Sequence, residues 1–174
     1  MSTDLEKAAK IAIQMEDEGY AIYVKAAKKT KNPLGRSTLQ AIADKEVLHK
    51  KAIENFYNKL TGKKYDGALI EENTQWSGKL KSEVLNDIKD EIGKRSPEET
   101  DLSKSYDISM DLERKGYDFY KNIANTTDNQ QAKDLFNYLA KEENLHFELL
   151  QDTHLYLSKP AEWFNKEEKW LVEG

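Results

Sequence analysis

Two glutamate–histidine pairs are the groups in this chain best suited to chemistry. In both, two residues separate the acid from the imidazole: Glu46 precedes His49, and Glu143 precedes His146. Residues i and i+3 of a helix share one face, so each pair can reach the same metal ion. One Glu-x-x-His sequence is a weak signal in a glutamate-rich chain. Two copies at matching places indicate a metal site made of carboxylate and imidazole ligands.

The two Glu-x-x-His sequences occupy equivalent positions because the chain contains an internal repeat. Residues 3–60 align without a gap onto residues 100–157, with 17 identities in 58 positions. The repeat also pairs Glu16 with Glu113, and each of these acids lies 30 residues before its Glu-x-x-His sequence. A repeat retained only for packing would keep mainly apolar residues. This one also keeps Glu, His and Tyr, which predicts a chemical role.

The four acids fall within the apolar stripes of the predicted helices. A buried ionised carboxylate is strongly destabilising unless it is paired or coordinated, and no Lys or Arg shares these stripes. Two divalent cations would balance four carboxylates, with both histidines as neutral ligands. Mixed oxygen and nitrogen donors suit iron or manganese, and zinc would also bind. A metal-free structural bundle is the alternative that this charge argument disfavours.

Helices joined in pairs must position these groups. Apolar periodicity and capping residues predict four helices, with Thr3 as the first N-cap and a break at Asn32-Pro33-Leu34-Gly35. The predicted helices cover residues 4–30, 36–60, 101–126 and 130–157. Short loops make the partners in each pair antiparallel neighbours. We therefore expect an all-α four-helix bundle over residues 1–157, made of two tandem helix pairs, 3–60 and 100–157.

The remaining residues are expected to connect and cover this bundle. Residues 61–99 form a long crossover with a short helix predicted at 79–92. Residues 158–174 are expected to pack on the bundle as an aromatic tail. The tail carries Trp163, Phe164 and Trp170.

The composition excludes several classes of protein. The 174 residues include no cysteine, which excludes thiolate metal sites, iron–sulfur clusters and cysteine nucleophiles. The net charge of −5 provides no basic surface for nucleic acid. No apolar run approaches the roughly 20 residues that span a bilayer, and the N-terminal MSTDLEKAAK lacks a signal-peptide core. We expect a cytoplasmic protein without nucleic-acid or membrane partners.

The motifs resemble those of a known family. One Glu from each of two helices and Glu-x-x-His from the other two is the di-iron pattern of ferritin-like bundles. Residues 15–23 (MEDEGYAIY) and 139–146 (LAKEENLH) are similar to the characteristic stretches of the rubrerythrin family, and the resemblance extends over residues 3–157. The tail sequence Tyr156-Leu157-x-x-Pro160-x-x-Trp163-Phe164 resembles the branch of that family that lacks a rubredoxin domain.

The resemblance implies a ferritin-like fold and a role for each site residue. Glu46 and Glu143 would bridge two iron ions, Glu16 and Glu113 would be terminal ligands, and each ion would take one histidine. The resemblance also implies that two tyrosines outside the ligand set would donate hydrogen bonds at the metal site. They are Tyr23 and Tyr120.

The implied activity is reduction of peroxide or dioxygen by a non-haem di-iron oxidoreductase. A separate donor such as rubredoxin would supply the electrons, and we expect a homodimer. The alternative is a non-enzymatic metal-binding or iron-handling protein with ferroxidase-like chemistry. The chain departs from typical rubrerythrins at Gly116, where they carry an additional Glu.

Three residues near the predicted ligands are expected to have structural roles. Gly19 and Gly116 would allow close approach of helices, although room beside the metals is the other possibility. Glu142, which directly precedes a predicted ligand, is expected to be solvated.

Overall fold

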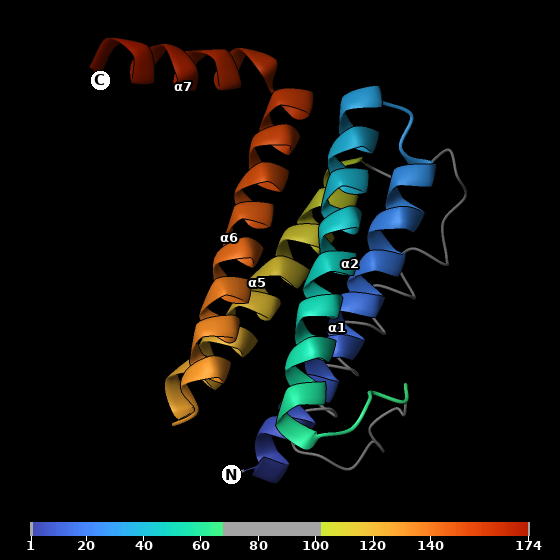
Figure 1. Cartoon of the computed structure of the whole chain (residues 1–174). Coiled ribbons are helices and arrows are strands. Elements are labelled where there is room, and N and C mark those ends of the chain that lie inside the picture. Colours follow the sequence, from blue (N-terminus) through green and yellow to red (C-terminus); the bar gives the residue numbers. More distant parts are fainter. Residues whose placement is uncertain (1, 68–101, 174) are drawn as a thin grey trace.

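The computed structural model describes residues 2–67 and 102–173, and every element in these two ranges is a helix. The helices are α1 (Ser2–Lys29), α2 (Pro33–Thr61), α5 (Leu102–Thr126), α6 (Gln130–Ser158) and α7 (Pro160–Glu173), as Figure 1 shows. The all-α prediction is confirmed. The helix predicted at residues 79–92 lies outside the described residues.

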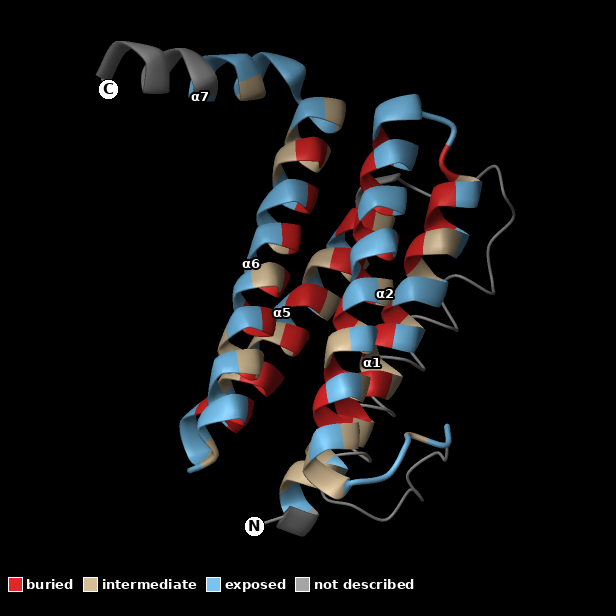
Figure 2. Ribbon diagram, viewed as in Figure 1, coloured by how far each residue is buried: buried red, intermediate tan, exposed pale blue. Residues whose placement is uncertain are grey.

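The four long helices form two antiparallel pairs. α1 packs along α2, and α5 packs along α6. The two pairs meet mainly through α2 and α6, whereas α1 and α5 contact each other less (Figure 1). In each of these four helices the buried residues lie on the side that faces the centre of the bundle, and the residues of the outer face are exposed (Figure 2).

The second helix of each pair begins with the same capping arrangement. The side chain of Asn32 accepts a hydrogen bond from the Gly35 N–H at 3.1 Å, and that of Asn129 accepts one from the Ala132 N–H at 2.9 Å. α2 therefore starts at Pro33, three residues earlier than predicted. A proline at the first helical position needs no N–H partner, so the segment predicted as a break is a helix start. Another boundary was also wrong: α1 begins at Ser2 and includes Thr3.

The predicted tail forms α7, which leaves the bundle at a steep angle beyond the end of α6 (Figure 1). Trp163 packs edge-on against Tyr156 of α6 and against Phe164, with ring centroids 5.2 Å apart in both pairs. Phe164 itself is 54 % exposed. Among the described helices, none has both the length and the apolar character needed to cross a membrane.

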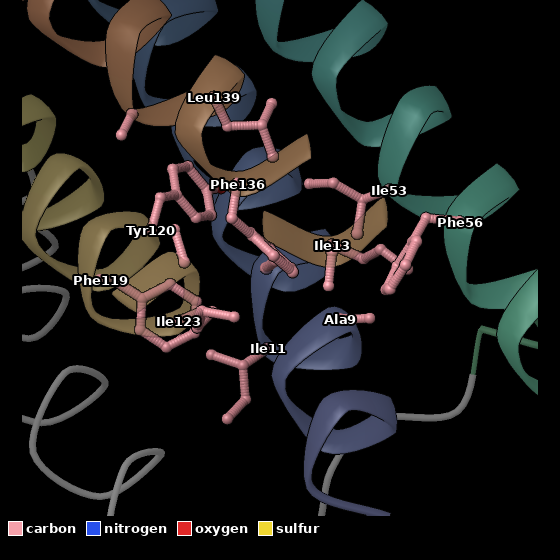
Figure 3. Close-up of a cluster of buried hydrophobic side chains, with 14 of the residues drawn as sticks. Ala9, Ile11, Ile13, Ile53, Phe56, Phe119, Tyr120, Ile123, Phe136 and Leu139 are labelled. Atoms are coloured by element: carbon pink, nitrogen blue, oxygen red, sulfur yellow. The ribbon is translucent and has the colours of Figure 1, made fainter. Parts of the chain in front are cut away.

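Two apolar clusters fill the interior at different levels of the bundle. One is built around Ile13, Ile53 and Phe136 and appears in Figure 3. The other is built around Leu39 and Leu150. The middle segment of each long helix lies between residues of the two clusters, and it is there that the predicted acids and histidines occur.

Candidate metal centre

The six predicted ligands come together in the middle of the bundle. α1 and α5 each contribute one Glu, and α2 and α6 each contribute a Glu and a His. Every one of these side chains is buried, with residue exposures between 1 % and 6 %. The residues are Glu16, Glu46, His49, Glu113, Glu143 and His146.

Each imidazole turns its Nδ1 atom towards carboxylates of other helices. Nδ1 of His49 lies 3.5 Å from Glu16 and 3.7 Å from Glu143. Nδ1 of His146 lies 3.4 Å from both Glu46 and Glu113. The helix register sets this arrangement, since the i, i+3 spacing holds each His on the same face as the Glu that precedes it.

The donor atoms form two overlapping groups. One group takes an oxygen or nitrogen atom from Glu16 and His49, and the other takes one from Glu113 and His146. Both groups include Glu46 and Glu143, and within each group the donor atoms lie within 4.8 Å of one another. A carboxylate has two oxygen atoms and can contribute to both groups at once.

Several donor atoms lack a hydrogen-bond partner although they are buried. They are one oxygen atom each of Glu16, Glu113 and Glu143, and both ring nitrogens of His49 and His146. In the described part of the chain, the only basic groups within ion-pair distance of the four acids are these two imidazoles. Unpartnered buried polar atoms are costly, so this donor set fits a bound cation. The clustered His and Glu residues therefore form a metal-binding site.

The metal-free site compensates for its acids with protons. Burial raises the pKa of Glu16 and Glu143 well above the usual range, and the neighbouring carboxylates add to the effect. Burial also opposes ionisation of Glu46, but the neighbouring Glu16 and the two facing imidazoles favour its charged form and lower its pKa to about 2. Burial alone would lower the pKa of both imidazoles. The facing carboxylates outweigh it and raise the pKa of His49 to about 10 and that of His146 to about 9.

Two buried tyrosines connect α1 and α5 through the site. Tyr23 on α1 donates a hydrogen bond to Glu113 on α5, and Tyr120 on α5 donates one to Glu16 on α1. Each tyrosine thus contacts the acid of the opposite half, although it lies two turns from the acid of its own helix. Burial, with the adjacent carboxylates, raises the pKa of both phenols well above 10, so they remain proton donors.

Gly116 and Gly19 make room for carboxylates. A Cβ atom at Gly116 would lie 2.7 Å from Oε2 of Glu143, and one at Gly19 would lie 3.7 Å from Cδ of Glu46. The expectation of close helix approach was therefore wrong, because the nearest atoms belong to acids of the site. The first distance is a clash, and the second is ordinary contact.

This difference predicts unequal effects of two matched substitutions. Gly116→Ala should displace the Glu143 carboxylate and so lower the metal affinity about tenfold. Mutations of groups that support a metal ligand typically lower the affinity about 10- to 100-fold, and this is the smaller end of that range. Gly19→Ala should leave binding within about threefold, because its Cβ fits. Calorimetric titration with Co²⁺ measures both. Equal affinities in the two variants would contradict this role for Gly116.

The environment of Glu142, a residue near the site, differs from the one predicted from the sequence. Its side chain is only 15 % exposed and lies 3.6 Å from Nε2 of His49 and 3.7 Å from Nζ of Lys45. The expectation of a solvated side chain was wrong, because Glu142 lies at the α2–α6 contact. The available signal was the repeat, in which Glu142 occupies the position equivalent to Lys45.

His154, the third histidine of the chain, lies outside the site and stacks on Tyr106, with ring centroids 5.5 Å apart.

Comparisons with known proteins agree with this architecture. The family model for Rubrerythrin matches residues 10–154. The comparison with curated proteins finds no match. A solved structure of a hypothetical protein from Pyrococcus furiosus is similar, with 18 % identity, a TM-score of 0.66 and coverage of 88 % of this chain and 89 % of that one.

A second similar structure is a bacterioferritin-related protein from Bacteroides fragilis, described as a dodecameric thioferritin in the bacterial domain. It is 20 % identical, with a TM-score of 0.65, and the match covers 94 % of this chain and 92 % of that one. At these identities the two structures establish the fold alone. They confirm the prediction of a ferritin-like helical bundle.

Proposed function

Because the chain belongs to the rubrerythrin family, we propose that it is a non-haem di-iron oxidoreductase that reduces peroxide or dioxygen. The observation that carries this proposal is the pair of donor groups that share Glu46 and Glu143. Glu46 and Glu143 would each help to hold both of two metal ions. Glu16 and His49 would complete the ligands of one ion, and Glu113 and His146 those of the other.

The charge of the donor set supports two ions. Four ionised carboxylates carry −4, which two divalent cations balance while the imidazoles bind as neutral ligands. The ions would replace the protons that compensate the acids of the metal-free site. Manganese or zinc would also satisfy these donors, so the assignment of iron rests on the family.

The space beside the acids suits a very small substrate. A cavity of about 20 Å³ is lined by the site carboxylates together with Gly19, Gly116, Tyr23 and Tyr120. This volume is close to that of one water molecule, so it matches peroxide or dioxygen better than an organic substrate. Reduced iron would supply the electrons that break the oxygen–oxygen bond. Since none of the 174 residues is cysteine, we expect electrons from a separate carrier such as rubredoxin.

Tyr23 and Tyr120 would hold the terminal carboxylates in place by donating hydrogen bonds to Glu113 and Glu16. Replacing either by Phe should lower the rate of oxidation of the iron-loaded protein about tenfold or more, as for other groups that orient metal ligands. Tyr20→Phe is the matched control, since Tyr20 is 40 % exposed on the same helix as Tyr23. Stopped-flow absorbance measures these rates. A loss no larger than that of Tyr20→Phe would show that the buried tyrosines only pack.

The proposed activity is tested with protein loaded anaerobically with two equivalents of Fe²⁺. Mixing with hydrogen peroxide or with dioxygen should oxidise the iron rapidly, and repeated cycles should follow when a reductant and a carrier are present. Glu143→Ala is the control, because it removes a ligand shared by both donor groups. If neither oxidant reacts with the loaded protein, the proposed function is wrong.

An iron-handling protein is the second candidate, and Gly116 favours it. Typical rubrerythrins carry an additional Glu at this position, whereas here the carboxylate of Glu143 fills the space beside the glycine. Such a protein would oxidise ferrous iron without sustained peroxide reduction. Single-turnover oxidation without multiple turnovers would identify it.

A further inference from the structure

The internal repeat breaks its symmetry at the residue before each shared glutamate. Lys45 and Glu142 occupy equivalent positions, directly before Glu46 and Glu143. Their charges are opposite, and the two side chains form an ion pair of 3.7 Å between α2 and α6. The two halves of the site therefore differ immediately outside the donor set.

This difference in charge affects the two histidines at Nε2, the ring nitrogen that does not face the site acids. Nε2 of His49 lies 3.6 Å from Oε2 of Glu142, a few tenths of an ångström beyond hydrogen-bond range. Nε2 of both histidines is buried without a hydrogen-bond partner among the described residues, but Glu142 lies within ion-pair distance of His49 alone. A small rotation of the Glu142 side chain would therefore bring a hydrogen-bond acceptor to Nε2 of His49 before Nε2 of His146.

His49, Glu142 and His146 form a third group of donor atoms that lie within 4.8 Å of one another, but a metal ion bound there is a poor explanation of the group. The rings of His49 and His146 are stacked, with centroids 5.3 Å apart and planes only 20° apart. The lone pair of an imidazole nitrogen lies in the ring plane. Nearly parallel rings at this separation direct their lone pairs along separate lines, so they do not converge on one ion.

On the basis of the proposed di-metal function, we propose that Glu142 is a positioning residue that makes the two metal positions unequal. Glu142 accepts a hydrogen bond from Nε2–H of His49, which fixes the ring orientation and leaves Nδ1 free to bind metal. Metal-bound histidines commonly donate their other N–H to a carboxylate in this way. The position that uses His49 therefore binds its ion more tightly than the position that uses His146.

Calorimetric titration of the full chain with Co²⁺ tests this inference, since Co²⁺ replaces iron without oxidation in air. The unmodified protein should bind two ions in two distinguishable steps. Glu142→Gln should weaken the tighter step about 10- to 100-fold and leave the weaker step within about threefold. Lys45→Gln is the matched control. It breaks the ion pair but leaves Glu142 beside His49, so both steps should persist.

A second comparison separates positioning from a general structural role. In a His49→Ala background, Glu142→Gln should cause no further loss of Co²⁺ affinity, because the two residues act as one unit. Equal losses in Lys45→Gln and Glu142→Gln, or two steps unchanged by Glu142→Gln, would overturn the inference while leaving the di-metal site intact. No Co²⁺ binding by the unmodified protein would overturn the proposed function as well.

Discussion

Addition of excess Co²⁺ or Fe²⁺ to the metal-free protein should raise its melting temperature by about 10 °C or more. An ion present at 1,000 times its Kd that binds only the folded state contributes about 4 kcal/mol. In a chain of this size, 1 kcal/mol corresponds to about 2–4 °C. The large effect is expected because several buried donor atoms of the site have no hydrogen-bond partner in the described structure until a cation binds. Calorimetry or circular dichroism under anaerobic conditions measures the shift.

Removal of a shared carboxylate should abolish most of this rise. Glu46→Ala and Glu143→Ala each delete a ligand common to both donor groups, so the metal-induced shift should fall below about 3 °C. Without metal, Glu143→Ala should be as stable as the parent or more stable, because burial opposes ionisation of its acid. Glu46→Ala should be less stable than the parent, because it removes the ionised carboxylate that faces both imidazoles. Glu148→Ala is the control, since Glu148 is exposed on the same helix as Glu143. If metal shifts no melting curve, the bundle is purely structural.

Metal affinity should rise steeply with pH. The pKa values of about 10 for His49 and about 9 for His146 mean that both rings carry a proton near neutral pH in the metal-free protein. Each metal ion must displace the proton of its own imidazole, so the affinity of each ion should rise about tenfold or more per pH unit between pH 6 and 8. The rise should level off above about pH 9–10, where the rings lose their protons unaided.

Co²⁺ titrations at several pH values, in buffers of different ionisation enthalpy, measure both the affinity and the number of protons released. His49→Ala removes one of the two imidazole protons, so the total number of protons released on metal binding should fall by about one. Affinity that stays constant between pH 6 and 8 would mean that the imidazoles do not bind metal through Nδ1.

The sequence alone determined the components of the site and the elements that carry them. The repeat placed Glu16 and Glu113 at equivalent points of two helices, and the i, i+3 spacing put each His on the face of its Glu. These are relations within one helix, and helix geometry makes them independent of the rest of the fold. The structure brings all six side chains together at the level between the two apolar clusters.

Only the tertiary structure decided which groups meet across helices. Tyr23 donates to Glu113 of the opposite half, Gly116 leaves room for Glu143, and Glu142 lies against His49 instead of in solvent. Each of these contacts depends on how far apart two helices pack and how they are rotated about their axes. Those distances are set by the whole core, which explains why a local pattern predicted which six side chains come together but not their neighbours.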